Sequence, residues 1–190
     1  MRKQIGDMTV AELGRLFPII LSDHDDAWGE AFEKEKAVIE GALGEDALTV
    51  EHIGSTAIPG IKAKPTIDLL VEVRTDADTE SIVRRMRDAG YQYSEQPDNP
   101  APHMMFMKGY TPEGFRGQAV HVHVRYPGDW DEIYFRDYLR SHTEAAREYE
   151  RLKTELWKKH EHNREDYTNG KTDFVKRISH MARQEKDGRG

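Results

Sequence analysis

The chain has 190 residues, of which 37% are hydrophobic and 33% are charged, and its formal net charge is −7. This composition is typical of a folded soluble domain and too hydrophobic for a disordered chain. There is no cysteine, which excludes disulfides, thiolate metal ligands and cysteine nucleophiles. No stretch approaches the roughly 18 apolar residues of a membrane helix, and the first residues lack the apolar core of a secretory signal. We therefore expect a cytoplasmic protein with no membrane partner, and the negative charge argues against one that coats nucleic acid.

In the first half of the chain, the spacing of apolar residues predicts helices that alternate with single strands. The first helix starts at a capping box, in which Thr9 precedes Glu12 by three residues. Asp25 or Asp26 would cap the second helix, and Gly44 would end it. The expected elements are a helix over 9–16, a strand over 18–21, a helix over 28–44, strands over 48–54 and 66–73, and a helix over 76–90.

In the second half, strands come first and helices follow. A further strand begins near residue 91, and the Pro-rich loop over 94–102 is a candidate mobile segment or active-site lid. The remaining expected elements are strands over 103–110 and 118–126 joined by a turn over 111–117, helices over 131–142 and 143–160, a last helix from Arg164 or Thr172 to Ala182, and a frayed tail over 184–190.

This order of elements predicts an α+β fold. Because the strands come singly between helices and then consecutively, the sheet should be mixed, with helices packed on it. The expected organisation is an N-terminal extension over 1–17, an α/β core over 18–128, and C-terminal helices over 129–190 packed on the core.

The loop between the strands over 48–54 and 66–73 is rich in small, hydroxyl-bearing and lysine residues. Gly54 and Ser55 follow the first strand, where backbone N–H groups and a hydroxyl could approach a phosphate because glycine has no Cβ. Lys62 and Lys64 could meet its negative charge. The alternative is an ordinary turn with solvated surface lysines.

Alternation along the strand over 66–73 places Asp68 on the face opposite the apolar residues. Asp68 is therefore a candidate metal ligand or base, with a plain polar-face aspartate as the alternative. Glu72 lies on the same face about 13 Å away, too far to share a metal easily, and is expected to be a solvated residue at the strand end. Thr66 and Leu70 complete this face, and the apolar face consists of Ile67, Leu69, Val71 and Val73.

The strand over 118–126 carries His121, His123 and Arg125 at alternate positions. They should share one face, with successive Cα atoms about 6.6 Å apart. Two imidazoles placed this way could hold one cation, or one could act as an acid or base while the other contacts a phosphate. Two exposed histidines on a half-wet strand are the alternative. His52 shares a face with Gly54 by parity, so it either approaches the same pocket or is a packed or surface histidine.

The stretch EHIGSTAIPGIKAKPTIDLLVEV resembles the signature of the GrpB family, in which Gly-Ser-Thr, Pro-Gly, Lys-Pro and Ile-Asp occur at this spacing. The resemblance continues through HVHV, FRDYLRSHTEAAREYERLK and YTNGKTDF, and so covers nearly the whole chain from about residue 20. The family's usual Tyr-Asp-Pro-x-Trp is here His-Asp-Asp-Ala-Trp, so only the Asp and the Trp are kept. The resemblance implies a fold of the nucleotidyltransferase superfamily, similar to the polymerase-β core.

In that superfamily a Gly-Ser turn contacts phosphates, and carboxylates on two strands hold two Mg²⁺ ions. The resemblance matches Gly54–Ser55 to the turn and Asp68 to the second carboxylate, while the first carboxylate falls on Thr66. A histidine of the HVHV strand would replace the third, and a set of one carboxylate with imidazoles suits Mn²⁺ or Zn²⁺ better than Mg²⁺.

The resulting candidate residues fall into three groups. The expected catalytic residues are Asp68, His121 and His123; the phosphate or nucleotide contacts are Gly54, Ser55, Thr56, Lys64 and Arg125; and the ligands of a divalent metal are Asp68, His121 and His123, with His52 as a further candidate. Stretches that match the family also contain Arg136, Tyr138, Tyr167 and Lys171, some of which are expected to reach the ligand.

The leading hypothesis is a nucleotidyltransferase-fold protein that binds a nucleotide or another phosphorylated metabolite and transfers a nucleotidyl group with a divalent metal. The first alternative is a catalytically degenerate module that binds a nucleotide or a coenzyme A-like ligand. It is favoured by Thr66 at an acidic position and by the fusion of some relatives to a kinase of coenzyme A synthesis. The second alternative is a phosphohydrolase with a histidine-bound metal.

Overall fold

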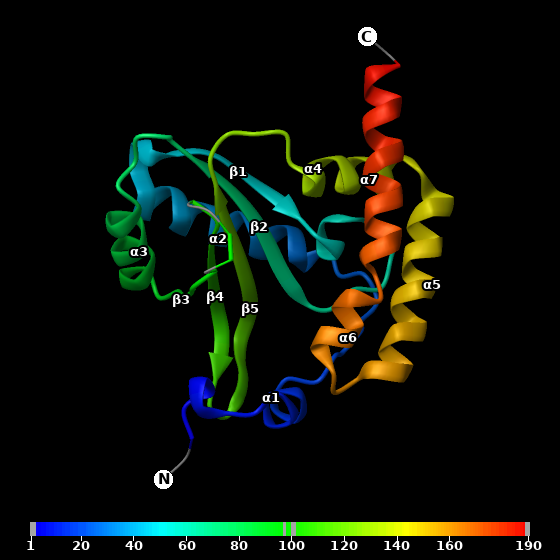
Figure 1. The fold of residues 1–190 in the computed structure, drawn as a ribbon, viewed down its shortest axis with the longest axis horizontal. Helices are drawn as coiled ribbons and strands as arrows, with labels where there is room; N and C mark the ends of the chain where they lie inside the picture. Colours follow the sequence, from blue (N-terminus) through cyan, green and yellow to red (C-terminus); the bar gives the residue numbers. More distant parts are fainter. Residues whose placement is uncertain (1–2, 97, 100–101, 189–190) are drawn as a thin grey trace.

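The computed structural model describes residues 3–96, 98–99 and 102–188. Within these residues, five strands form one sheet in the order β1-β2-β5-β4-β3 (Figure 1). The strands β2 and β5 are parallel, and the other neighbouring pairs are antiparallel, which confirms the predicted mixed sheet and α+β class. The strands are β1 (Ala47–Ile53), β2 (Thr66–Val73), β3 (Gln92–Ser94), β4 (Met104–Thr111) and β5 (Gly114–Arg125).

The helices lie close to their predicted ranges. The capping box of Thr9 and Glu12 is formed, and the Asp25 carboxylate accepts a hydrogen bond from the Ala27 amide at the start of the second helix. The helices are α1 (Val10–Leu16), α2 (Ala27–Leu43), α3 (Thr79–Asp88), α4 (Asp131–Ser141), α5 (Thr143–His160), α6 (Arg164–Asn169) and α7 (Thr172–Asp187), with short 3-10 turns η1 (Ile5–Asp7), η2 (Gly44–Asp46) and η3 (Ser55–Ala57).

The main core lies between one face of the sheet and helices α2 and α3. The predicted apolar face of β2 is buried there, since Ile67, Leu69 and Val71 are each 0% exposed. Val120, Val122 and Val124 of β5 join the same cluster. The opposite face of β2 and β5 therefore carries Asp68 and the two histidines, as the alternation predicts.

The C-terminal helices form a second cluster beside the sheet (Figure 1). Phe135 of α4, Tyr149 of α5 and Phe174 of α7 pack ring against ring. Ile58 and Ile61, which follow η3, belong to the same cluster. The loop between β1 and β2 is thus held against these helices, and this contact brings α5–α7 to the polar face of the sheet.

One predicted strand and one predicted turn in the first 120 residues are wrong. The segment 18–21 is not a strand, because its neighbour Ser22 makes only an isolated bridge with Ala63. The turn predicted over 111–117 is shorter, since β4 ends at Thr111 and β5 already begins at Gly114. Part of the loop predicted as a lid, residues 97 and 100–101, lies outside the described residues.

The tail is also more ordered than predicted, because α7 continues to Asp187. Arg183 binds Asp131 and Asp129 at the start of α4, and Lys186 donates to the hydroxyl of Tyr134 at 2.8 Å. These contacts hold the last turns of α7 against α4. None of the helices in the described part of the chain is long and apolar enough to cross a membrane.

Candidate functional site

Asp68 and His121 are neighbours across the parallel pair of β2 and β5. His121 Nδ1 donates to Asp68 Oδ1 at 3.2 Å, because an ionised carboxylate can only accept. His121 Nε2 lies 2.7 Å from the hydroxyl of Tyr110 and accepts from it when the ring is neutral. Burial would raise the pKa of Asp68, but the hydrogen bond to His121 and the charges of His121, His123 and Lys64 hold it below its usual value. Asp68 is therefore an anion at neutral pH.

Three basic side chains, Lys64, Arg164 and Lys171, lie within electrostatic range of one another, and we call them the cation cluster. Asp68 acts on the two lysines with the opposite charge. Burial, followed by the charges of Arg164 and Lys171, lowers the pKa of Lys64 to about 8, against the opposing effect of Asp68. Burial also lowers the pKa of Lys171, with Asp68 opposing this shift and Arg164 adding to it. Positive charge thus exceeds negative charge among these four groups, and this local excess favours an anion.

Two buried tyrosines, Tyr167 and Tyr149, lie near the cation cluster. The Nζ atoms of Lys171 and Lys64 lie 4.7 Å and 5.7 Å from the centre of the Tyr167 ring. Tyr167 is 1% exposed, and its hydroxyl has no hydrogen-bond partner in the described part of the chain. Burial raises the pKa of Tyr149 to about 12, and a hydrogen bond with Ser55 opposes this shift. An unpaired buried hydroxyl is costly, so Tyr167 supplies a donor that a bound anion could use.

The turn that follows β1 contacts Asp68 through Gly54. Gly54 has φ +72°, and a Cβ at this position would lie 2.5 Å from Asp68 Oδ2. Ser55 faces Tyr149, as its hydrogen bond shows. Thr56 is buried, donates to the carbonyl of Thr66 at 3.1 Å and bonds to His52. The hydroxyl of Thr56 therefore makes hydrogen bonds within the fold and does not face the site. Two of the three predicted turn residues, Gly54 and Ser55, border the site.

Replacing Gly54 with alanine should destabilise the protein by about 2 kcal/mol or more, because a strained backbone and a clash with Asp68 act together. Gly60→Ala is the matched control, since Gly60 has φ +77° but open space around its missing Cβ. We expect Gly60→Ala to cost about 1 kcal/mol. Urea denaturation of both variants measures the difference, and equal losses would show that the contact with Asp68 is unimportant.

Two further residues, His52 and Glu72, lie outside the site. His52 pairs in register with Leu69 on the core face and stacks on Phe32 with ring centres 4.7 Å apart. Of the two alternatives, the packed histidine is therefore confirmed, and the approach to the Asp68 pocket is wrong. Burial lowers the pKa of His52 to about 4. Glu72 is not a solvated strand end, because it accepts hydrogen bonds from the Gly128 amide and the Trp130 indole.

His123 and Arg125 share the face of His121, as predicted, and follow it along β5 in register with Leu70 and Glu72. His123 pairs in register with Leu70, and burial lowers its pKa. Arg125 pairs with Glu72, and its guanidinium donates to the carbonyls of Val124 and Met104. Arg125 therefore supports the far end of the sheet face.

The side chains around Asp68 fit a divalent metal poorly. Both ring nitrogens of His121 are engaged, and one carboxylate oxygen of Asp68 faces Gly54. In the part of the chain that the structure describes, no three His, Asp or Glu side chains are grouped so that they could hold a metal ion. Mg²⁺ prefers several oxygen ligands, and the neighbouring lysines would repel any cation. The same surroundings suit an anion.

The comparison with known proteins decides the family. The family model described as "GrpB protein" matches residues 18–181. The chain belongs to the GrpB family. This GrpB-family chain is 38% identical over 164 residues to the glutamate-rich protein GrpB of Alkalihalophilus pseudofirmus, a match that covers 84% of this chain and 93% of that protein. It is 39% identical over 155 residues to a UPF0157 protein of Pseudomonas aeruginosa, covering 81% of this chain but 63% of the longer relative.

Solved structures agree with the fold. The crystal structure of the conserved protein GrpB from Enterococcus faecalis has a TM-score of 0.74 and 31% identity, and the match covers 87% of this chain and 98% of that one. The Cid1 poly(U) polymerase has a TM-score of 0.50 and 14% identity over 73% of this chain and 43% of that one, which shows a similar fold and no more. The family and the nucleotidyltransferase-like fold implied by the resemblance are confirmed, while the predicted domain boundaries stay a prediction.

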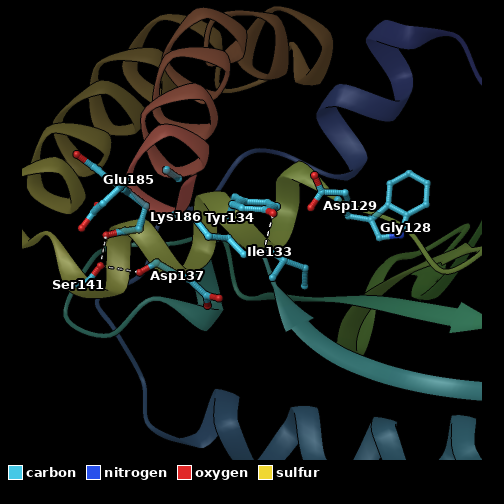
Figure 2. Close-up of a pocket in the computed structure, with 11 residues that line it drawn as sticks. Gly128, Asp129, Ile133, Tyr134, Asp137, Ser141, Glu185 and Lys186 are labelled. Atoms are coloured by element: carbon cyan, nitrogen blue, oxygen red, sulfur yellow. Dashed lines mark hydrogen bonds between the residues drawn. The ribbon is translucent and has the colours of Figure 1, made fainter. Parts of the chain in front are cut away.

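Two residues from family-matching stretches lie outside the cation cluster. Arg136 donates to Glu51 at 2.6 Å and to the carbonyl of His52 at 3.0 Å, and so fixes α4 to β1. Tyr138 lines a pocket of about 430 Å³ between α4 and α7, where Figure 2 shows Tyr134, Asp137 and Lys186. None of the residues predicted from the sequence as catalytic, phosphate-binding or metal-binding lines this pocket.

Sequence reasoning also missed three residues of this GrpB-family site: Tyr110, Tyr149 and Arg164. Tyr110 was assigned only to a strand, and its role depends on the approach of His121 across the β4–β5 pair. A fourth residue, Lys153, is 1% exposed, donates to the carbonyl of Lys62 and lies 4.5 Å from the Tyr149 ring centre. Lys153 lies four residues after Tyr149, on the apolar side of the helix, and this spacing is the sequence feature that could have predicted its burial beside Tyr149.

Proposed function

We propose that this chain binds a nucleotide or another phosphorylated metabolite at the cation cluster. The observation that carries this proposal is the charge imbalance there. The charges of Arg164 and Lys171 act on Lys64, Asp68 opposes this effect, and the Nζ atoms of Lys64 and Lys171 both lie close to the Tyr167 ring centre, at 5.7 Å and 4.7 Å. Phosphate oxygens would supply the missing negative charge, and charge-assisted hydrogen bonds to partly buried groups are strong.

Two further features support an anionic ligand. The buried hydroxyl of Tyr167, whose ring lies beneath both lysines, has no hydrogen-bond partner among the described residues and is a donor that a phosphate oxygen could use. Asp68 attracts the lysines from one side and, through His121, holds Tyr110 in place. The site is therefore organised before the ligand arrives, which lowers the entropy cost of binding.

Group transfer or hydrolysis is the second candidate, and the Asp68–His121 pair favours it. A carboxylate that orients an imidazole is a common arrangement for a general base. This candidate is weaker than ligand binding for two reasons: Thr66 occupies the first acidic position, and the side chains fit a divalent metal poorly. We accordingly propose no step that depends on a metal.

One relative suggests a specific compound to include in the tests. The dephospho-CoA kinase of Mycolicibacterium paratuberculosis is 26% identical to this chain over 154 residues, and the match covers 70% of this chain and 38% of that protein. A phosphorylated coenzyme A precursor carries the same anionic groups as a nucleotide, so the cation cluster suits both.

Calorimetric titration with nucleoside triphosphates, dephospho-coenzyme A and inorganic tripolyphosphate tests the proposal. We expect saturable binding of at least one compound, and no binding of the matching nucleoside without phosphate. Asp68→Asn separates the two candidate functions, because removal of a negative charge should preserve or strengthen phosphate binding, whereas any transfer or hydrolysis should be lost. If no phosphorylated compound binds or is turned over, with or without Mn²⁺, the proposal fails.

A further inference from the structure

A second pocket adjoins the cation cluster where β2 and β5 begin. It has a volume of about 360 Å³, and its walls come from the segment before α2, the start of β2 and the start of β5. Lys64 and Arg164 line it as well, so the pocket and the cation cluster share two side chains. We call it the β2–β5 pocket. Its size falls within the range of about 300–1,000 Å³ that is usual for small-molecule sites.

The walls of the β2–β5 pocket are mainly apolar. Ile20 and Phe115 line it together with Pro65 and Ala119. Ile20 is 48% exposed and Phe115 is 42% exposed, so two of the large hydrophobic side chains on the described surface meet in one concave place. Single exposed apolar residues are ordinary, whereas a shared pocket that combines them with a few polar groups is a feature of ligand sites.

The polar groups in the walls are largely occupied. The Gln118 amide donates to the carbonyls of Pro65 and Ala119 at 2.8 Å and 3.0 Å. Phe115 packs edge-on against Phe17 with ring centres 5.1 Å apart, which fixes its ring and still leaves part of it exposed. These walls offer an aromatic surface and little hydrogen bonding, so they suit an uncharged ring.

The shared residues connect this surface to the charged site. Arg164 is held by the carbonyl of Phe17 at 3.0 Å and by the hydroxyl of Tyr110 at 3.4 Å. These two hydrogen bonds fix its guanidinium where the cation cluster meets the pocket. A phosphate that contacts Arg164 and Lys64 would have its attached organic group at the mouth of the β2–β5 pocket.

We propose that the β2–β5 pocket binds the aromatic ring of the ligand, such as a nucleobase, while the cation cluster binds its phosphates. This inference rests on the proposed function and adds the class of ligand: a phosphate ester with an uncharged ring within reach of its phosphates. Stacking on Phe115 and contact with Ile20 supply the added affinity, so the ring compound binds more tightly than phosphate alone.

The test compares ATP and UTP with inorganic tripolyphosphate on the full chain by calorimetry. On the unaltered protein we expect the nucleotides to bind about tenfold more tightly than tripolyphosphate. Ile20→Trp fills the pocket from an exposed position and should lower nucleotide affinity about tenfold while leaving tripolyphosphate binding unchanged. Val38→Trp on α2, where Val38 is 40% exposed and lines none of the pockets described above, is the matched control and should change neither affinity.

The outcomes separate the two proposals. Equal affinity of the unaltered protein for nucleotide and tripolyphosphate, or equal loss of both in Ile20→Trp, would overturn the ring subsite and leave phosphate binding in place. Absence of binding by every phosphate compound would overturn both. The comparison on the unaltered protein needs no substitution, so it decides the matter even where a variant folds poorly.

Discussion

Replacing Lys171 with methionine is expected to lower triphosphate affinity by about 100-fold while raising the stability of the free protein by about 1 kcal/mol. The binding loss follows from removal of a charge that would contact phosphate. The gain in stability follows because burial lowers the pKa of Lys171 and Arg164 lowers it further, while Asp68 compensates only in part. The charged ammonium is thus destabilised in the folded state, and methionine keeps much of the side-chain length without the charge.

A matched control for this prediction lies on α7, the helix that Lys171 directly precedes. Lys176 is exposed, and Lys176→Met should change neither affinity nor stability appreciably. Calorimetry with the triphosphate and urea denaturation of the free protein provide the two readouts. A Lys171→Met variant that binds normally would contradict a role in the cation cluster, and one that is less stable would show that its attraction to Asp68 outweighs burial and repulsion.

The sheet could be predicted from the sequence because its central strands alternate cleanly. Ile67 to Val73 and Val120 to Val124 repeat with period two, so Asp68 and His121 had to lie on the opposite face from the core. The segment 18–21 was wrongly predicted as a strand because its residues are as apolar as those of a buried strand. Ile19 is 1% exposed, but its amide bonds to the carbonyl of Glu161, outside any sheet.

The parity argument failed at His52 for a local reason. Alternation holds only while the backbone stays extended, and Gly54 leaves it with φ +72°. Gly54 can therefore face Asp68 although His52, two residues earlier, faces the core beside Leu69. Where a glycine ends a strand, the alternation of side chains between the two sheet faces need not continue past the glycine.

The cation cluster could not be predicted from any local pattern. Arg164 and Lys171 lie about a hundred residues after Asp68 in the sequence, and their approach depends on how α5–α7 pack on the loop that contains Ile58 and Ile61. Sequence periodicity shows which residues of a helix are apolar, but not which strand the helix will face. Lys64 could be predicted as a phosphate contact from its loop, and Lys171 through the family resemblance, whereas nothing in the sequence indicates Arg164.

The arrangement suggests how a nucleotidyltransferase-like fold can bind phosphates with few carboxylates. In the superfamily pattern, carboxylates bind metal ions, which in turn neutralise the phosphates. By the family resemblance one acidic position falls on Thr66 here, Asp68 is the remaining carboxylate on that strand face beside the site, and its charge acts on Lys64 and Lys171. We propose that in this chain the basic side chains contact the phosphates directly.

Lys153 provides a test of the buried charge near the site through the pH dependence of stability. Burial, then the charge of Lys171, lowers the pKa of Lys153 to about 7, with Glu150 opposing. An unfolded lysine titrates near 10.4, so between about pH 7 and that value the unfolded chain binds more protons and folding stability rises with pH. Below pH 7 both states are protonated, and the full cost of burying the charge remains.

Lys153→Met removes this titration. Its stability relative to the unaltered protein should therefore be greatest below about pH 7 and should decline by up to about 1.4 kcal/mol per pH unit as the pH rises above it. Urea denaturation of both proteins at about pH 6, 7.5 and 9 measures this difference. Lys158→Met, at an exposed position of the same helix, should follow the unaltered protein at every pH. Parallel pH curves for Lys153→Met and the unaltered protein would mean that Lys153 titrates normally in the folded state, and the buried-charge description of this region would have to be abandoned.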